Sequence, residues 1–168
     1  MMRGRARLVT GLVVTALALN AGAVAAEQWG GIEPGESSMA AVRGLRGSPS
    51  RTTTQKVDGY DTAEWIYEDA KAPGGIRRMT VDFGLMTPAG YRPDLVRSFK
   101  LEPKPGAFDK NSITTGWGPP VGVGKDGDVE LFFYKEGLFV YFAPDGHAVA
   151  TMTFTPPQLP PPGAVPQR

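Results

Sequence analysis

A pattern of glycines and prolines that occurs twice constrains this sequence more than any other feature. The segment "PGESSMAAVRGLRGSP" begins at Pro34, and "PGAFDKNSITTGWGPP" begins at Pro105. Both read Pro-Gly, then a β-branched apolar residue, then Gly-x-Pro, and each matching position is 71 residues apart. Pro-Gly before a short run and Gly-x-Pro after it indicate a helix with a defined start and stop. The chain is therefore expected to contain two helix-led units.

Six runs of alternating or aromatic-rich residues follow, three after each predicted helix. They are rich in β-branched and aromatic residues and bounded by Gly, Pro or Asp, which favours antiparallel strands. Residues 84–94 read as a long loop inserted in the first unit. The sequence predicts a two-layer α+β fold of two tandem units, each a helix with a three-stranded antiparallel sheet. The six runs are residues 63–69, 75–83, 95–103, 129–137, 137–146 and 148–156.

The two ends of the chain differ in composition from the middle. "MMRGRAR" is followed by an apolar stretch in which Val24 and Ala26 occupy the small-residue positions of a signal-peptidase site. Residues 1–26 are therefore predicted to be a cleaved signal peptide, and the mature protein to be periplasmic or secreted. Six prolines in the last 14 residues predict a disordered tail. The remaining segments are a first unit at 27–103, a second unit at 104–156 and the tail at 157–168.

Export changes the charge balance of the protein. Removal of Arg3, Arg5 and Arg7 leaves 15 basic residues against 17 acidic ones, so no positive excess remains to attract nucleic acid or an anionic membrane. The chain contains no cysteine, which excludes disulfides, thiol catalysis and a lipid-modified N-terminal cysteine. We expect a soluble protein that is not a lipoprotein, binds no nucleic acid and does not insert stably into a membrane.

The stretch "GPPVGVGKDG", residues 118–127, superficially matches a phosphate-binding loop. Asp126 stands where such a loop needs a hydroxyl, two prolines remove backbone donors, and a predicted strand follows instead of a helix. Asp126, Asp128 and Glu130 do not fit a calcium loop, and the single His147 cannot supply a histidine-rich metal site. The sequence therefore predicts no cofactor, no metal and no catalytic residue. We do not expect an enzyme.

Aromatic residues indicate where a function could lie. If Glu136–Gly137 form a two-residue turn, Tyr134 pairs with Phe139 and Phe132 with Tyr141, so these four share one face of a hairpin. That face either packs against the other unit or is exposed and binds a protein. The predicted partner-binding residues are Phe132, Tyr134, Phe139 and Tyr141, with Trp65, Tyr67 and Arg78 in the first unit.

A family resemblance supports a binding role. "GESSMAAVRGLRGSP", followed by an aromatic strand, resembles the SmpA/OmlA (BamE-like) family of small outer-membrane assembly lipoproteins, whose helical pair ends in V-x-x-x-L-G-x-P. Val42, Leu45, Gly47 and Pro49 carry the resemblance, which extends over residues 31–156. Two such units in tandem resemble the β-lactamase-inhibitor-protein fold, whose concave sheet grips a partner. Members of the SmpA/OmlA family are anchored in the outer membrane through a lipidated cysteine. This chain has no cysteine, so the resemblance does not imply such an anchor here.

These observations predict an exported, soluble, non-catalytic module. It would bind another envelope protein through an aromatic sheet face, as a scaffold or as an inhibitor. The alternative is a binder of a small molecule or a cell-wall fragment, using a groove between the two units.

Overall fold

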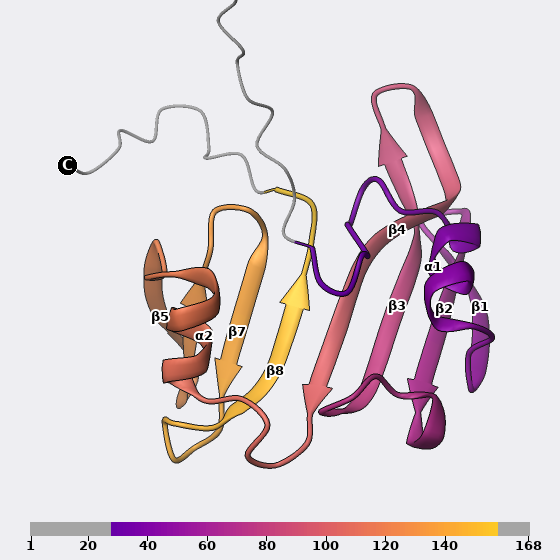
Figure 1. The fold of residues 1–168 in the computed structure, drawn as a ribbon. Coiled ribbons are helices and arrows are strands. Elements are labelled where there is room, and N and C mark those ends of the chain that lie inside the picture. Colours follow the sequence, from indigo (N-terminus) through magenta and orange to yellow (C-terminus); the bar gives the residue numbers. More distant parts are fainter. Residues whose placement is uncertain (1–27, 158–168) are drawn as a thin grey trace, which may run out of the picture.

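The computed structural model describes residues 28–157, which form one sheet covered on one face by two helices (Figure 1). The predicted signal peptide and all but Pro157 of the predicted tail lie outside the described residues. In chain order the elements are α1 (Met39–Arg46), β1 (Arg51–Val57), β2 (Tyr60–Glu68), the 3-10 turn η1 (Asp69–Lys71), β3 (Ile76–Thr87), β4 (Gly90–Pro103), α2 (Lys110–Trp117), β5 (Gly122–Asp126), β6 (Val129–Phe133), β7 (Leu138–Phe142) and β8 (Val149–Phe154).

All eight strands belong to one antiparallel sheet, in the order β1-β2-β3-β4-β8-β7-β6-β5. The two halves of the chain meet where β4 pairs with β8, with Phe99 opposite Phe154 and Leu101 opposite Met152. The Phe99 and Phe154 rings stack there with centroids 4.4 Å apart. Each half therefore contributes four strands to a continuous sheet.

This architecture shows that the predicted fold of two helix-plus-three-stranded units is wrong. The six predicted strands are present, but the prediction lacked β1 and β5, which form the two edges of the sheet. All seven residues of β1 are exposed, so this strand has no buried face to produce an alternating pattern. β5 is also exposed almost throughout and begins Gly-Val-Gly. With one eight-stranded sheet and two short helices, the resemblance to tandem BamE-like units and to the β-lactamase-inhibitor-protein fold is not supported.

The prediction of a long loop at residues 84–94 is also wrong. β3 and β4 continue through this segment as a long hairpin, with Thr87 opposite Gly90 across a two-residue turn. Two register shifts near Phe83 interrupt the pairing, which breaks the simple alternation that would have marked the strands.

Both predicted helices are confirmed at the expected places. The Ser38 side chain accepts a hydrogen bond from the backbone N–H of Ala41 and caps α1. Asp109 and Ser112 cap α2 with reciprocal side-chain bonds. Each helix has two turns and buries a single fully enclosed residue, so packing on the sheet, not helix propensity, must hold it in place. These residues are Val42 in α1 and Ile113 in α2.

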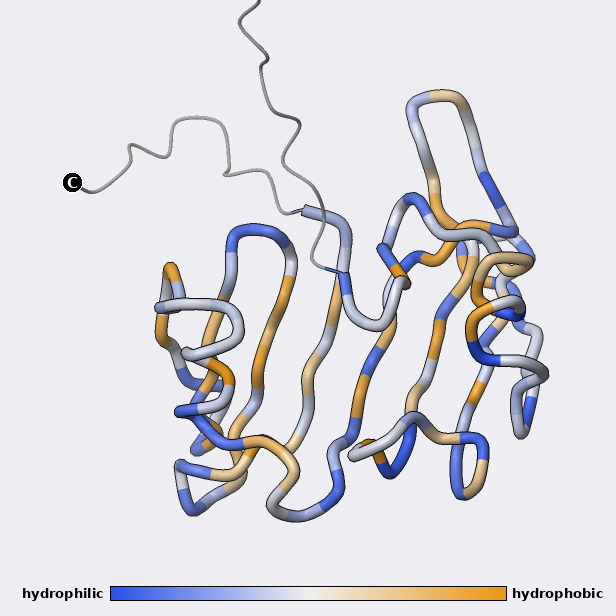
Figure 2. Tube along the Cα trace, viewed as in Figure 1, coloured by the Kyte–Doolittle hydropathy of each residue, from blue (hydrophilic) through white to orange (hydrophobic). Residues whose placement is uncertain are grey.

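The core lies on one face of the sheet only. Both helices are on that face, near opposite ends of the sheet, and the segment before α1 crosses between them (Figure 1). Ile32 of this segment is fully buried, and Gly35 and Ser37 form backbone hydrogen bonds with Val96 of β4. Hydrophobic and hydrophilic residues are mixed along the central strands, as expected when only one side is covered (Figure 2). The fully buried strand residues include Tyr67, Met79, Val81, Phe83, Phe99, Leu101, Leu138, Val140, Met152 and Phe154.

Candidate interaction surface

The face of the sheet opposite the helices is called here the uncovered face. Successive strand residues point to opposite sides, so every second residue of each strand lies on it. The core residue Phe132 lies beside α2, with the Lys110 Nζ atom 5.7 Å from its ring. Its chain neighbours Leu131 and Phe133 therefore point to the uncovered face. In the first half, the Arg43 guanidinium of α1 lies 4.9 Å from the centre of the Trp65 ring, so Trp65 is on the core side. By the same alternation, its chain neighbours Glu64 and Ile66 lie on the uncovered face.

Four apolar side chains gather on this face in the second half of the sheet; we call them the aromatic cluster. Leu131 is opposite Tyr141 and Phe133 is opposite Phe139, with the two Phe ring centroids 5.1 Å apart. All four side chains are half-buried. They are large apolar groups that retain contact with solvent on a side that neither helix reaches.

The glycines of "GVGKDG" explain why the aromatic cluster is open toward the sheet edge. Gly122 and Gly124 of β5 are opposite Phe133 and Leu131, on the uncovered face. A Cβ atom on Gly122 would lie 3.7 Å from the Phe133 ring, so any side chain there would lie against it. The glycine-rich stretch is thus an edge strand that carries no side chain beside the cluster.

The structure divides the predicted partner-binding residues between the two faces. Phe139, Tyr141 and Arg78 lie on the uncovered face. The other four are core residues on the helix-covered face, each no more than 8% exposed: Phe132, Tyr134, Trp65 and Tyr67. The predicted register for the β6–β7 hairpin, with Tyr134 opposite Phe139, is wrong by one residue.

The turn between β6 and β7 causes that error. The backbone N–H of Tyr134 donates to the carbonyl of Leu138, so three residues close the hairpin instead of two. Gly137, the third of them, has a φ of 102°, which side-chain-bearing residues rarely adopt. A three-residue turn ending in such a glycine is a common hairpin connection. Applied to "KEG", this rule would have placed Leu131 and Phe133, which the prediction missed, beside Phe139 and Tyr141.

The buried tyrosines have structural partners. The Tyr67 hydroxyl donates to the carbonyl of Gly47, at 3.2 Å, and the Tyr134 hydroxyl donates to that of Gly118, at 3.0 Å. Both glycines are the residues at which a helix ends. Burial raises the pKa of Tyr67 above its ordinary value, although Arg43 and Arg46 act in the opposite direction. In each half, a tyrosine thus ties the end of a helix to the sheet.

A network of paired charges occupies the uncovered face in the first half of the sheet. Arg78 lies between two carboxylates, with its Nε atom 3.2 Å from Glu68 and its Nη1 atom 4.0 Å from Glu102. Arg51 adds a 3.4 Å contact to Glu68, and Lys100 a 3.6 Å contact to Glu102. Arg77 adds a 2.6 Å contact to Glu102, so four cations share two carboxylates and the network is net positive. Arg78 is therefore part of a polar surface beside the aromatic cluster and is already paired.

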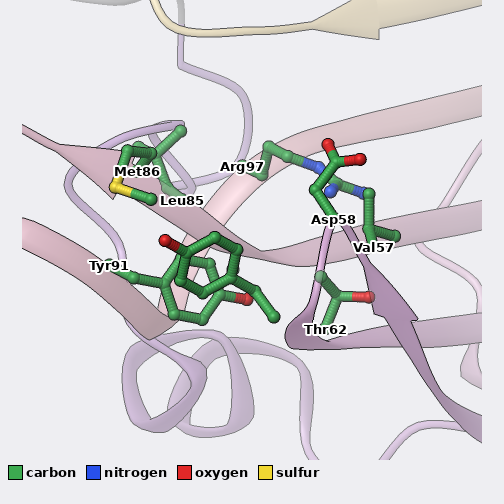
Figure 3. Close-up of a pocket in the computed structure, with 9 residues that line it drawn as sticks. Val57, Asp58, Thr62, Leu85, Met86, Tyr91 and Arg97 are labelled. Atoms are coloured by element: carbon green, nitrogen blue, oxygen red, sulfur yellow. The ribbon is translucent and has the colours of Figure 1, made fainter.

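A groove of about 310 Å³ lies at the other end of the uncovered face (Figure 3). The rings of Tyr60 and Tyr91 form one wall, with centroids 4.5 Å apart, and the Tyr91 hydroxyl donates to the carbonyl of Asp61. Gly84 lies beneath Tyr91, where a Cβ atom would be only 2.2 Å from the hydroxyl oxygen. The groove lies within the first half, whereas the sequence placed a ligand groove between the two units. Its lining residues are Val57, Asp58, Tyr60, Thr62, Gly84, Leu85, Met86, Tyr91 and Arg97.

Two other classes of site are absent from residues 28–157. No group of three or more His, Asp and Glu side chains in this range is arranged to hold a metal ion. Neither helix in it is long and apolar enough to cross a membrane.

Comparisons with known proteins add little to this description. No protein-family model matches the chain, and no curated protein matches it. Among solved structures, the chain is similar to a DUF4309 family protein from Bacillus subtilis, with 12% sequence identity and a TM-score of 0.47. The similarity covers 75% of this chain and 82% of the other. At this level the similarity assigns neither a family nor an activity to this chain.

Proposed function

We propose that this chain is a non-catalytic binding protein of the cell envelope, which recognises another protein through the uncovered face of its sheet. The observation that carries the proposal is the aromatic cluster of Leu131, Phe133, Phe139 and Tyr141. Its side chains are half-buried on a face opposite both helices, while the core of the described domain lies entirely on the other face. The export signal predicted from the sequence places such a partner in the envelope.

The surroundings of the cluster suit protein recognition. Aromatic anchors near the centre of an interface, inside a polar rim that excludes water, supply most of the binding free energy in protein complexes. On β8, Thr151 and Thr153 stand opposite Tyr141 and Phe139 and provide hydroxyl groups on one side. Beyond them, Lys100 of the charge network is opposite Thr153. A partner with an apolar protrusion and charges at matching distance would complement this surface, whether the protein acts as a scaffold or as an inhibitor.

Site-specific photo-crosslinking in living cells tests the proposal. A photoreactive residue at position 139 reports on the uncovered face, and one at position 123 is its matched control. Val123 is 64% exposed and is opposite Phe132, so it lies on the helix-covered side near the same sheet edge. We expect one dominant protein adduct from position 139, identified by mass spectrometry, and none of that protein from position 123.

A pair of charge substitutions makes the test quantitative. With the captured protein purified, Phe139→Asp should weaken binding by about 30-fold or more, since a lost hot spot costs about 2 kcal/mol or more. Val123→Asp should leave the affinity unchanged. Equal adducts from both positions, or a folded Phe139→Asp variant that binds normally, would refute the assignment of this face.

The groove beside Tyr60 and Tyr91 supports a second candidate function, the binding of a small molecule or cell-wall fragment. Aromatic walls with a polar end suit such a ligand, and Arg97 forms none of the ion pairs found among the described residues. Soluble cell-wall fragments should then raise the melting temperature by mass action. The stabilisation should disappear in Tyr60→Ala and persist in Phe139→Asp. No stabilisation of the wild-type protein by any fragment would reject this candidate.

A further inference from the structure

The outer edge of β1 is open. β1 pairs only with β2, and all seven of its residues are exposed. The pairing runs without a register shift from Arg51 opposite Ile66 to Val57 opposite Tyr60. A regular strand of this length at the edge of a sheet is a template for pairing with another strand.

The turn at the end of β1 defines which backbone groups are free. Asp58 and Gly59 form a two-residue turn in which both φ angles are positive, 51° and 85°. In such a hairpin the flanking pair, Val57 and Tyr60, is hydrogen-bonded, and antiparallel pairs then alternate between bonded and non-bonded. The backbone N–H and C=O groups that point away from β2 therefore belong to Thr52, Thr54 and Lys56.

The usual protections of a strand edge are weak on β1. Natural edges are blocked by proline, by bulges or by charged side chains, and β1 has neither a proline nor a bulge. Its two cations are already paired inside the same molecule: Lys56 lies 2.6 Å from Asp61, and Arg51 lies 3.4 Å from Glu68. By contrast, β5 at the opposite edge has only five residues, two of them glycines, and offers a shorter template.

We propose that β1 pairs antiparallel with β1 of a second copy of this chain, about a two-fold axis at Thr54. In this register Thr54 is opposite Thr54 of the second copy, and Thr52 is opposite Lys56. These are the residues with outward backbone groups, so all of those groups find partners. Arg51 then faces Val57, and no two cations face each other directly. It is also the register in which all seven residues of both strands overlap.

The chemistry of the strand favours this partner over an unrelated one. Directly opposed threonines are a favourable cross-strand pair, while like charges in direct opposition are unfavourable. A register centred on Lys56 would place the two lysines opposite each other and is excluded on that ground. The dimer would form one continuous sheet with both uncovered faces on the same side, because the two-fold axis is perpendicular to the sheet. The pairing itself does not depend on the proposed function.

Sedimentation velocity on the purified mature protein, without any partner, measures the association. Thr54→Pro removes the central outward N–H and none of the bonds to β2, so the fold should persist while the dimer is lost. Thr54→Val keeps the N–H and the β-branched shape and should dimerise like the wild type. A wild-type protein that stays monomeric into the high-micromolar range would overturn the proposal, as would a folded Thr54→Pro variant that dimerises normally.

Single cysteines test the register, because the natural sequence contains none. In a dimer of the Thr54→Cys variant the two introduced thiols would be opposite each other, at a Cα separation of about 5.5 Å that a disulfide can span. In a dimer of the Thr52→Cys variant they would be offset by four residues, roughly 13 Å along the strands. We expect Thr54→Cys to form an intermolecular disulfide and Thr52→Cys not to. Equal crosslinking of the two variants would overturn the register. Hydrogen exchange at the Thr54 amide identifies the partner of this edge. If that amide is protected only when a different protein is added, the edge pairs with that protein and the proposed self-pairing is wrong.

Discussion

Two adjacent phenylalanines provide a stringent test of which face of β6 is core. Phe132 is 8% exposed and packs edge-on against Phe142, with ring centroids 4.7 Å apart. Phe133 is half-buried on the uncovered face. Phe132→Ala should leave a cavity and cost about 3–5 kcal/mol of unfolding free energy. Phe133→Ala creates no enclosed cavity and loses only the transfer free energy of its buried half, about 1 kcal/mol.

Scanning calorimetry and urea unfolding of the two variants measure this difference. At roughly 4 °C per kcal/mol for a domain of this size, Phe132→Ala should lower the melting temperature by about 12–20 °C and Phe133→Ala by about 4 °C. The substitutions are identical and adjacent, so their effects on the unfolded chain nearly cancel in the comparison. Equal destabilisation, or a larger effect at Phe133, would show that the faces have been exchanged and that the register of the hairpin is wrong.

Two further predictions concern the ends of the helices. Tyr67→Phe removes the hydrogen bond to the Gly47 carbonyl and should cost about 0.5–1.5 kcal/mol in urea unfolding, whereas Tyr60→Phe, at an exposed ring, should change little. The backbone N–H of Ser112 donates to the Asp109 carboxylate and lowers the pKa of that carboxylate in the folded protein. The ionised cap therefore stabilises the fold fully above the ordinary pKa of Asp, about 3.9, and this stabilisation is lost as the pH falls through the lower folded pKa. Asp109→Asn should make the free energy of unfolding less sensitive to acid and leave it nearly unchanged at pH 7. Urea unfolding across a pH series measures this. If the variant loses stability in acid as the wild type does, the carboxylate of Asp109 does not have this role in the cap.

The elements with a buried face could be predicted from the sequence, and those without one could not. Both helices have sharp chemical boundaries, with a capping side chain before them and Gly-x-Pro after them. Six strands alternate between core and solvent and are visible for that reason. β1, with the sequence RTTTQKV, contacts solvent on both faces, so nothing in its pattern distinguishes a strand from a polar loop. Its pairing is held by the backbone, which a side-chain pattern does not report.

The candidate site was predictable in location but not in detail. The aromatic hairpin of the second half was recognised, yet Phe132 and Phe133 were exchanged between faces because the turn was read as two residues instead of three. A change of one residue in a turn moves every side chain of the strand to the other side. The tyrosine groove was missed because Tyr60 and Tyr91 are distant in sequence and meet only through the extended β3–β4 hairpin.

The strand order has a consequence for how the protein is made. β8 is the last strand of the described chain, yet it occupies the middle of the sheet, between β4 and β7. During synthesis, α1 and β1–β4 emerge first and can pair as neighbours, but the edge of β4 then stays open beside Phe99 and Leu101. Strands β5–β7 can likewise pair with one another, but without β8 they cannot join the sheet of the first half. Completion of the core therefore requires the six residues of β8, which join the two partial sheets into one.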